Sequence, residues 1–278
     1  STVPAFWERM QNGQSGIRRI QQFDPSRCVS QVAGEVIEFD ETEVLSKKEL
    51  RRMDPFVRYG LGAAQRAMAD CGLDLERVDR ERVGVLAATG HSDADWSQAQ
   101  AAIDSGSTVT THLFNQMRPI HHRAPGPMPA LMADPRMHVE LIADGIHVHP
   151  AVIAMVRQAV PADRIVLVTD AMSATGQSDG SYMLGDLAVT VTDGVARLTE
   201  GGALAGSTLT MDRAVRLVVR QCGFSLSDAV MAASVTPARL LRRDDIGSIE
   251  PGKDADLVAL DDDLVLQQVW HKGALVTD

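Results

Sequence analysis

The sequence contains little cysteine: three cysteines occur among its 278 residues, far apart at positions 28, 71 and 222. This excludes a small disulfide-stabilised protein, and an odd number of distant thiols is typical of a reduced, cytoplasmic protein. No apolar run approaches the roughly 18 residues of a membrane helix, and no charged-then-apolar signal segment opens the chain. Acidic residues outnumber basic ones 37 to 27, so the net charge of −10 argues against nucleic acid as a partner.

Histidine is absent from the first 90 residues, so any imidazole chemistry belongs to the rest of the chain. Residues 1–89 carry 13 basic and 14 acidic side chains, whereas the remainder carries 14 and 23. The sequence has no internal repeat, low-complexity tract or Gly/Ser linker. Its 45% hydrophobic and 23% charged residues are sufficient for a buried core. We therefore expect two parts of different character that meet without a spacer.

Local patterns in the first part predict short elements. Asp24-Pro25-Ser26 indicates a turn, and residues 32–39 have strand character. Residues 46–49 form a capping box, and Asp54-Pro55 starts an amphipathic helix that ends near residue 71. Residues 83–88 predict a short buried strand.

The first part resembles one enzyme family over about residues 1–86. The runs that carry the resemblance are FWERMQNGQSGIRRIQQFDPS, AGEVIEFD and LSKKELRRMDPFVRYGLGAAQRAMADCGLDLERVDRERVGVL. They are similar to the N-terminal region of the β-ketoacyl-acyl-carrier-protein synthases, which implies a truncated α/β thiolase-like fragment. The nucleophilic cysteine and the two catalytic histidines of that family have no match here, so the segment is not equipped for condensation.

The second part alternates strands with helices, the pattern of a parallel α/β sheet. We expect four strands, ending at residues 88–90 and spanning 109–114, 139–143 and 165–169. Residues 92–95 have the composition of a helix N-cap after the first of them.

Polar side chains follow all four expected strands. His91, His112, His147 and Asp170 each come where a strand ends. In a (β/α) barrel these ends face one mouth, where active sites form. Two neutral imidazoles suit a divalent metal such as Zn²⁺, and a neighbouring carboxylate can take a proton from an activated water. The pattern predicts a metal-assisted hydrolytic site.

Residues 84–278 resemble a second enzyme family. The motifs are GHSDAD, TTHLFNQM, HHRAPGP, ELIADGIHVHP, IVLVTDAMSATG, GGALAGSTLTM, VTPARLL and IGSIEPGKDADLVALD. They are similar to the N-acetylglucosamine-6-phosphate deacetylases of the amidohydrolase superfamily. The resemblance implies the C-terminal half of a (β/α)8 barrel with part of a small β-sandwich over residues 87–278. The hairpin-like pattern at 184–200 and residues 246–278 would belong to that β-sandwich.

The resemblance also implies residue roles. His91 and His112 match metal-binding histidines, most simply for one Zn²⁺, and Asp170 matches a catalytic aspartate that acts as general base and then general acid. The implied substrate-binding residues are Asn115, Gln116, Arg123, Asp144, Gly145, Ile146, His147, Leu204, Ala205 and Gly206. Arg123 would bind the phosphate, and His147 would orient the acetyl carbonyl. The implied reaction converts N-acetylglucosamine 6-phosphate to glucosamine 6-phosphate and acetate.

The chain lacks the H-x-E-G-P-F stretch whose glutamate completes the metal site in that family. We therefore expect a weakened site and a half-barrel with two unpaired edges. Two truncated resemblances that meet at residues 83–90 indicate a fusion, an artefactual reading frame or an incomplete gene product. Besides an impaired deacetylase, two alternatives stay open: a synthase fragment without its nucleophile, and a non-catalytic fusion that self-associates as a homodimer or larger assembly.

The other histidines receive plainer interpretations. His121 and His122 indicate either a contact beside the phosphate or a solvated loop, and His138, His149 and His271 indicate surface or packing positions. The methionines at 128, 132 and 137 indicate packing and not copper binding.

Overall fold

The structure is a computed structural model that describes residues 8–9, 11–21, 23–27, 31–36, 39–40, 42, 55–70 and 88–277. The chain divides into two compact units, Ser1–Asp79 and Arg80–Asp278. The predicted capping box at 46–49, Cys28, Cys71 and most of the predicted strand at 83–88 lie outside the described residues. Among the described residues, no helix is both long and apolar enough to cross a membrane.

The described residues of the first unit include a small antiparallel pair and a long helix. Strand β1 (Arg18–Arg19) pairs with β2 (Val32–Ala33), and helix α3 spans Pro55–Asp70. The predicted turn at Asp24 is the start of the 3-10 helix η1 (Pro25–Arg27), where the Asp24 carboxylate accepts the Ser26 amide.

Within the predicted strand over residues 32–39, ladder pairs are described for Val32 and Ala33, and residues 37–38 lie outside the described residues. Gly34 follows directly and weakens a strand. The amide of Gln21 donates to the side-chain carboxylate of Glu35, at 2.9 and 3.0 Å from its two oxygens.

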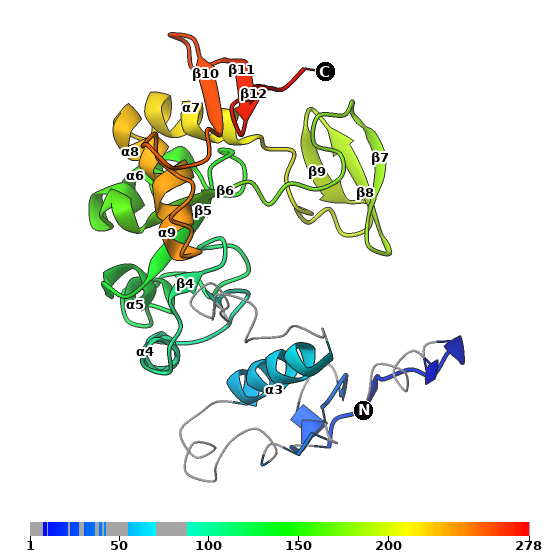
Figure 1. The fold of residues 1–278 in the computed structure, drawn as a ribbon. Helices are drawn as coiled ribbons and strands as arrows, with labels where there is room; N and C mark the ends of the chain where they lie inside the picture. The colour runs from blue at the N-terminus through cyan, green and yellow to red at the C-terminus, as the bar shows by residue number, and fades with distance from the viewer. Residues whose placement is uncertain are drawn as a thin grey trace. The chain divides into compact units, whose positions relative to one another are not determined.

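The four strands predicted for the second part are present and form one parallel sheet in the order β3-β4-β5-β6. They span Ala88–Thr89, Val109–Thr110, His138–Ile142 and Ile165–Val168. Figure 1 shows the helices of this unit gathered on one side of the sheet. Between the strands lie α4 (Trp96–Asp104), α5 (Met128–Ala133), α6 (Pro150–Ala159) and η4 (Ala162–Arg164). After the sheet come α7 (Met211–Gln221), α8 (Leu226–Val230), the π-helical turn η5 (Met231–Val235) and α9 (Thr236–Leu240).

The predicted N-cap over residues 92–95 is confirmed at its last residue. Asp95 caps α4 and accepts the amide of Gln98 at 2.9 Å, while the Gln98 side chain accepts the amide of Asp95 at 2.9 Å. This reciprocal capping box satisfies two amides that the first helical turn leaves free. His149 is the N-cap of α6, and its Nδ1 accepts the Ala151 amide at 3.2 Å.

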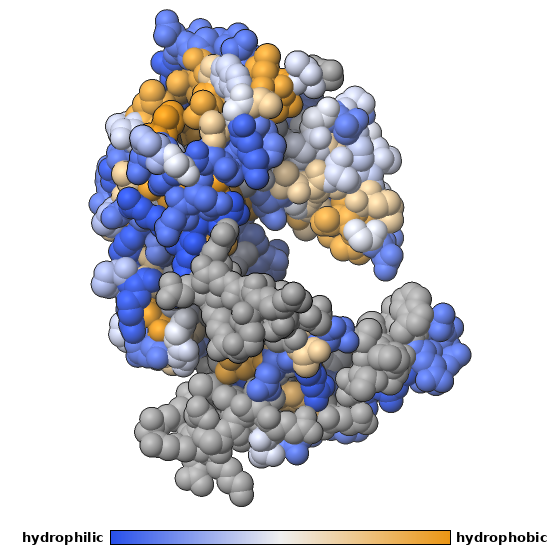
Figure 2. All heavy atoms as spheres, viewed as in Figure 1, coloured by the Kyte–Doolittle hydropathy of each residue, from blue (hydrophilic) through white to orange (hydrophobic). Residues whose placement is uncertain are grey.

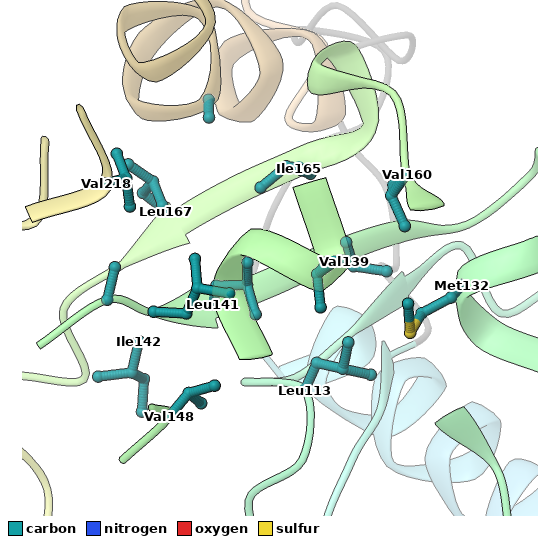
Figure 3. Close-up of a cluster of buried hydrophobic side chains, with 14 of the residues drawn as sticks. Leu113, Met132, Val139, Leu141, Ile142, Val148, Val160, Ile165, Leu167 and Val218 are labelled. Carbon is teal, nitrogen blue, oxygen red and sulfur yellow. The ribbon is translucent and has the colours of Figure 1, made fainter. Parts of the chain in front are cut away.

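The core lies between the sheet and its helices. Alternate residues of β5 and β6, among them Val139, Leu141, Ile165 and Leu167, are buried and meet Val218 of α7 and its neighbours (Figure 3). Strand alternation thus directs one side of each strand to the helices and leaves the other side for the interior of the curved sheet. The predicted packing role of the three methionines is confirmed, because Met128, Met132 and Met137 are all buried in this core.

In the described part of the second unit, two antiparallel sheets accompany the parallel one. Strands β7 (Gly180–Leu184), β8 (Leu187–Thr192) and β9 (Val195–Leu198) form one, and β10 (Leu257–Leu260), β11 (Leu266–His271) and β12 (Ala274–Leu275) form the other. The predicted hairpin is confirmed between β8 and β9, where Asp193 and Gly194 both have positive φ, as a two-residue hairpin turn requires. Figure 2 shows hydrophobic surface on the β7–β9 sheet, whose exposed side chains include Met183, Leu184 and Leu187.

Candidate functional site

A cavity of about 530 Å³ opens where the parallel strands end. His91, His112 and Asp170 each lie two residues beyond the last residue of their strands β3, β4 and β6, and His147 follows β5. Because parallel strands end at one edge of a sheet, four segments distant in sequence place their polar side chains on one cavity. The remaining lining residues are Asn115, Gln116, Ile142, Ala171, Met172, Leu184, Leu187, Leu198, Leu204, Ala205 and Gly206.

The backbone at this edge is strained. His91, His112 and Asp170 have φ values of 43°, 26° and 50°, in the region that side chains with a Cβ rarely occupy. Phe114 and Gln116 in the same loop as His112 also have positive φ, at 79° and 52°. Such strain persists only where the surroundings enforce it, and it concentrates at functional sites.

The two strand-end histidines face one another. The Nε2 atoms of His91 and His112 are 3.0 Å apart, and the ring planes are tilted by 44°. Two nitrogen ligands at about 2.0–2.1 Å from a tetrahedral metal lie about 3.3 Å apart, so this spacing fits a pair of ligands to one ion. Within the described part of the chain, however, no group of three or more His, Cys, Asp or Glu side chains could hold a metal.

A third histidine is held by a buried carboxylate. Nδ1 of His147 lies 2.6 Å from Oδ2 of Asp144, and the two side chains are only 8% and 6% exposed. The other carboxylate oxygen of Asp144 accepts the amides of Ile146 and His147, both at 2.8 Å. Burial raises the pKa of Asp144, but the hydrogen bonds from His147 and the two amides outweigh it, so the pKa is lowered overall. An ionised Asp144 fixes Nδ1 of His147 as the donor and leaves Nε2 for other contacts.

The segment before α7 lies against Asp170. The Ser207 amide donates to the Asp170 carbonyl at 2.8 Å, and the Met172 amide donates to the Ser207 carbonyl at 2.9 Å. Gly206 has a φ of 64°, and a Cβ there would lie 3.2 Å from the Asp170 carbonyl oxygen. Both the backbone conformation and the close approach therefore favour glycine at this position.

The structure brings together most of the predicted site residues but not all. His91, His112, Asn115, Gln116, His147, Asp170 and the stretch 204–206 line one cavity. The Asn115 side chain donates to the carbonyls of His112 at 3.1 Å and Leu113 at 3.4 Å, so it also holds its own loop.

Four predicted substrate-binding residues lie off this cavity. Arg123 is exposed in a loop, where Nη1 lies 2.6 Å from Nε2 of His122. Asp144 and Ile146 border an adjoining cavity of about 30 Å³ that shares His147, Leu204 and Gly206 with the large one. A Cβ on Gly145 would lie 3.1 Å from Cδ1 of Leu217. The internal hydrogen bonds of Asp144 make it a support for His147 in this structure.

Sequence reasoning missed Glu140, a half-buried carboxylate in the middle of β5. Its Oε2 accepts the His112 amide at 3.3 Å. Burial raises the pKa of Glu140, and so does the nearby charge of Asp170. The contact with His112 lowers the pKa but does not offset burial, so the pKa is raised overall. The available signal was a charged residue within a strand of the predicted parallel sheet.

Three comparisons with known proteins all relate this chain to amidohydrolases. The sequence model of the Amidohydrolase family matches residues 52–276. The chain is 47% identical to an N-acetylgalactosamine-6-phosphate deacetylase of Escherichia coli O157:H7 over 204 residues, which are 73% of this chain and 53% of that protein. It is 43% identical to an N-acetylglucosamine-6-phosphate deacetylase of Vibrio furnissii over 196 residues, which are 70% and 49% of the two chains.

Among solved structures, the fold is similar to that of a mutant N-acetyl-D-glucosamine-6-phosphate deacetylase from Mycobacterium smegmatis in complex with N-acetyl-D-glucosamine-6-phosphate. The TM-score is 0.67 and the identity 48%, over 69% of this chain and 51% of that one. The chain thus spans about half the length of the deacetylases from Escherichia coli O157:H7 and Vibrio furnissii.

Proposed function

The chain belongs to the amidohydrolase family, and on that basis we propose that it hydrolyses the acetamide of N-acetylglucosamine 6-phosphate to glucosamine 6-phosphate and acetate. The observation that carries the proposal is the convergence of His91, His112, His147 and Asp170 on one cavity at the strand ends. Relatives at 43% and 48% identity are named as deacetylases of this substrate, which supports the same assignment.

In the proposed mechanism Asp170 takes a proton from the attacking water and later delivers it to the departing amine. His147, held by Asp144, would donate from Nε2 to the acetyl carbonyl oxygen when it is protonated, or orient the amide when it is neutral. The apolar residues of the cavity, such as Leu184 and Leu204, would exclude bulk water from the reacting amide.

His91 and His112 would hold a divalent metal, most simply one Zn²⁺. A cation there supplies Lewis acidity to the acetamide carbonyl and makes a water molecule more acidic. Arg123 and its neighbour His122 offer a cationic group to the phosphate of the substrate, which requires the loop to approach the cavity.

N-Acetylgalactosamine 6-phosphate is a second candidate substrate, because a 47% identical relative carries that name. The two sugars differ in the configuration of one hydroxyl, which a single misplaced hydrogen-bond partner can discriminate. The experiment supplies each sugar phosphate to the zinc-loaded chain and quantifies acetate and free amine, with unphosphorylated N-acetylglucosamine as the control. We expect equal amounts of acetate and free amine. Acetate should be released faster from N-acetylglucosamine 6-phosphate than from N-acetylgalactosamine 6-phosphate. Absence of acetate from both phosphates would contradict the proposal.

The origin of the first part is a separate proposal. Residues 1–86 would derive from a β-ketoacyl-acyl-carrier-protein synthase, and residues 87–278 would form the deacetylase part. The family match starts at residue 52 and so overlaps the end of the first segment. Sequencing the source locus across codons 83–90 tests whether the reading frame is continuous there.

Self-association stays a proposal as well. Met183, an exposed apolar side chain of the β7–β9 sheet that does not line the cavity, supports it, and light scattering of the purified chain tests it. The cytoplasmic location and the lack of nucleic-acid and membrane partners stay predictions from composition.

A further inference from the structure

Glu140 faces the same side of its strand as the cavity. Its neighbours Val139 and Leu141 are fully buried toward the helices, whereas Ile142, two residues further along, lines the cavity. Since residues i and i+2 of a strand share a face, the Glu140 side chain points to the interior of the curved sheet, below the strand ends. A carboxylate in this position needs a partner to offset its lost hydration.

Three hydrogen bonds join Glu140 to residues 110–113, at the end of β4 and just beyond it. Its carbonyl accepts the Leu113 amide at 2.8 Å, its amide donates to Oγ1 of Thr110 at 3.2 Å, and its Oε2 accepts the His112 amide at 3.3 Å. The regular pairing of β4 with β5 stops at Thr110 and Val139. Beyond that pair, Glu140 binds the segment of residues 110–113 through both its main chain and its side chain.

The held segment is the strained one. His112 has a φ of 26°, a conformation that costs free energy and persists only when its surroundings favour it. A hydrogen bond from an amide to a carboxylate is stronger than one to a neutral acceptor. The same turn sets the direction of the His112 ring, whose Nε2 lies 3.0 Å from Nε2 of His91.

We propose that Glu140 is a positioning residue that holds the strained turn at His112 and thereby aligns the His91–His112 pair for a divalent cation. The inference rests on the proposed function in one respect, the assignment of that pair to the metal. Partners of this kind orient metal ligands, and their loss typically weakens metal binding by about 10- to 100-fold.

The test compares Zn²⁺ binding by full-length variants without substrate, using competition with a chromophoric chelator. Glu140→Met keeps the length of the side chain but removes the acceptor, and Glu140→Gln keeps one acceptor oxygen. Arg164→Met is the matched control, because it removes two hydrogen bonds to the carbonyls of Met132 and Met137 at the opposite end of the sheet. Hydrogen exchange at the His112 amide is measured on the same samples.

Glu140→Met should weaken Zn²⁺ binding by about 10-fold or more, whereas Glu140→Gln should stay within about threefold of the parent chain. Exchange of the His112 amide should accelerate in Glu140→Met and not in Arg164→Met. Equal Zn²⁺ affinity of Glu140→Met and the parent would overturn the proposal, as would an equal loss in Glu140→Gln.

Two further outcomes also bear on the proposed role of Glu140. Glu140 variants that do not fold would assign the residue to folding and overturn the positioning role, and so would a parent chain that binds no Zn²⁺. A parent chain that binds Zn²⁺ but releases no acetate would refute the proposed function, while the comparison of the two Glu140 variants would still decide this inference.

Discussion

At the scale of single residues, the buried Asp144–His147 pair is the most closely specified group of the site. The Asp144 carboxylate receives three hydrogen bonds, from the His147 ring and from two amides. These contacts lower its pKa despite burial. Its ionised form is therefore more stable in the folded protein than in the unfolded chain.

The lowered pKa of Asp144 predicts how stability responds to acid. The contribution of Asp144 is complete above the pKa of an unfolded aspartate, about 3.9, and is lost as the pH falls through the lower folded value. The free energy of unfolding should thus fall more steeply below about pH 4 in the parent chain than in Asp144→Asn. Urea denaturation at a series of pH values measures both slopes. If Asp144→Asn showed the same pH dependence as the parent chain, these contacts would not be what stabilises the ionised form of Asp144.

Residue by residue, the strand-end positions could be predicted from sequence because an apolar run followed by a polar residue marks the edge of a buried strand. His91, His112 and Asp170 belong to this class. The direction of a loop side chain has no such signature, so the sequence assigns Arg123 to the site although it lies off the cavity. Glu140 was not predicted, because a single charged residue between two apolar ones also fits an ordinary alternating strand and does not by itself indicate a functional site.

At the scale of elements, the segment of residues 204–207 connects the β7–β9 sheet to the edge of the parallel sheet that bears the cavity. Arg197 of β9 bridges to Leu204, and Ser207 bridges to Ala171 just after Asp170. Gly206 lies between these two bridges in a left-handed conformation. The four parallel strands and the β8–β9 hairpin could be predicted from hydrophobic pattern and turn residues. The bridges could not, because they form between backbone atoms and leave no pattern of side chains.

A pair of alanine substitutions tests the role of this segment. Gly206→Ala and Gly201→Ala both place a Cβ at positive φ, 64° and 80°, and each should destabilise the fold by about 1–2 kcal/mol. A Cβ at Gly206 meets the Asp170 carbonyl and Met172, whereas a Cβ at Gly201 meets no atom within 4 Å. Turnover should therefore fall in Gly206→Ala and stay unchanged in Gly201→Ala. Equal turnover in the two variants would show that the segment of residues 204–207 has no role in the proposed reaction.

At the scale of the whole molecule, every residue that lines the cavity belongs to the unit Arg80–Asp278. The net charge of −10 also comes mainly from the region after residue 89, which carries 23 acidic and 14 basic side chains. The candidate chemistry, the parallel sheet and the resemblance to deacetylases coincide in this unit. The proposed function therefore requires that the chain hydrolyse an acetamide with Asp170 as its proton carrier.

The rate of acetate release from N-acetylglucosamine 6-phosphate by the zinc-loaded parent chain and by Asp170→Asn tests this requirement most directly. Asparagine preserves the shape of the side chain but cannot accept or return the proton, so kcat should fall by about 10²- to 10⁴-fold while the affinity for the sugar phosphate changes little. A variant whose kcat stays within about twofold of the parent would contradict the assignment of Asp170 as general base and acid.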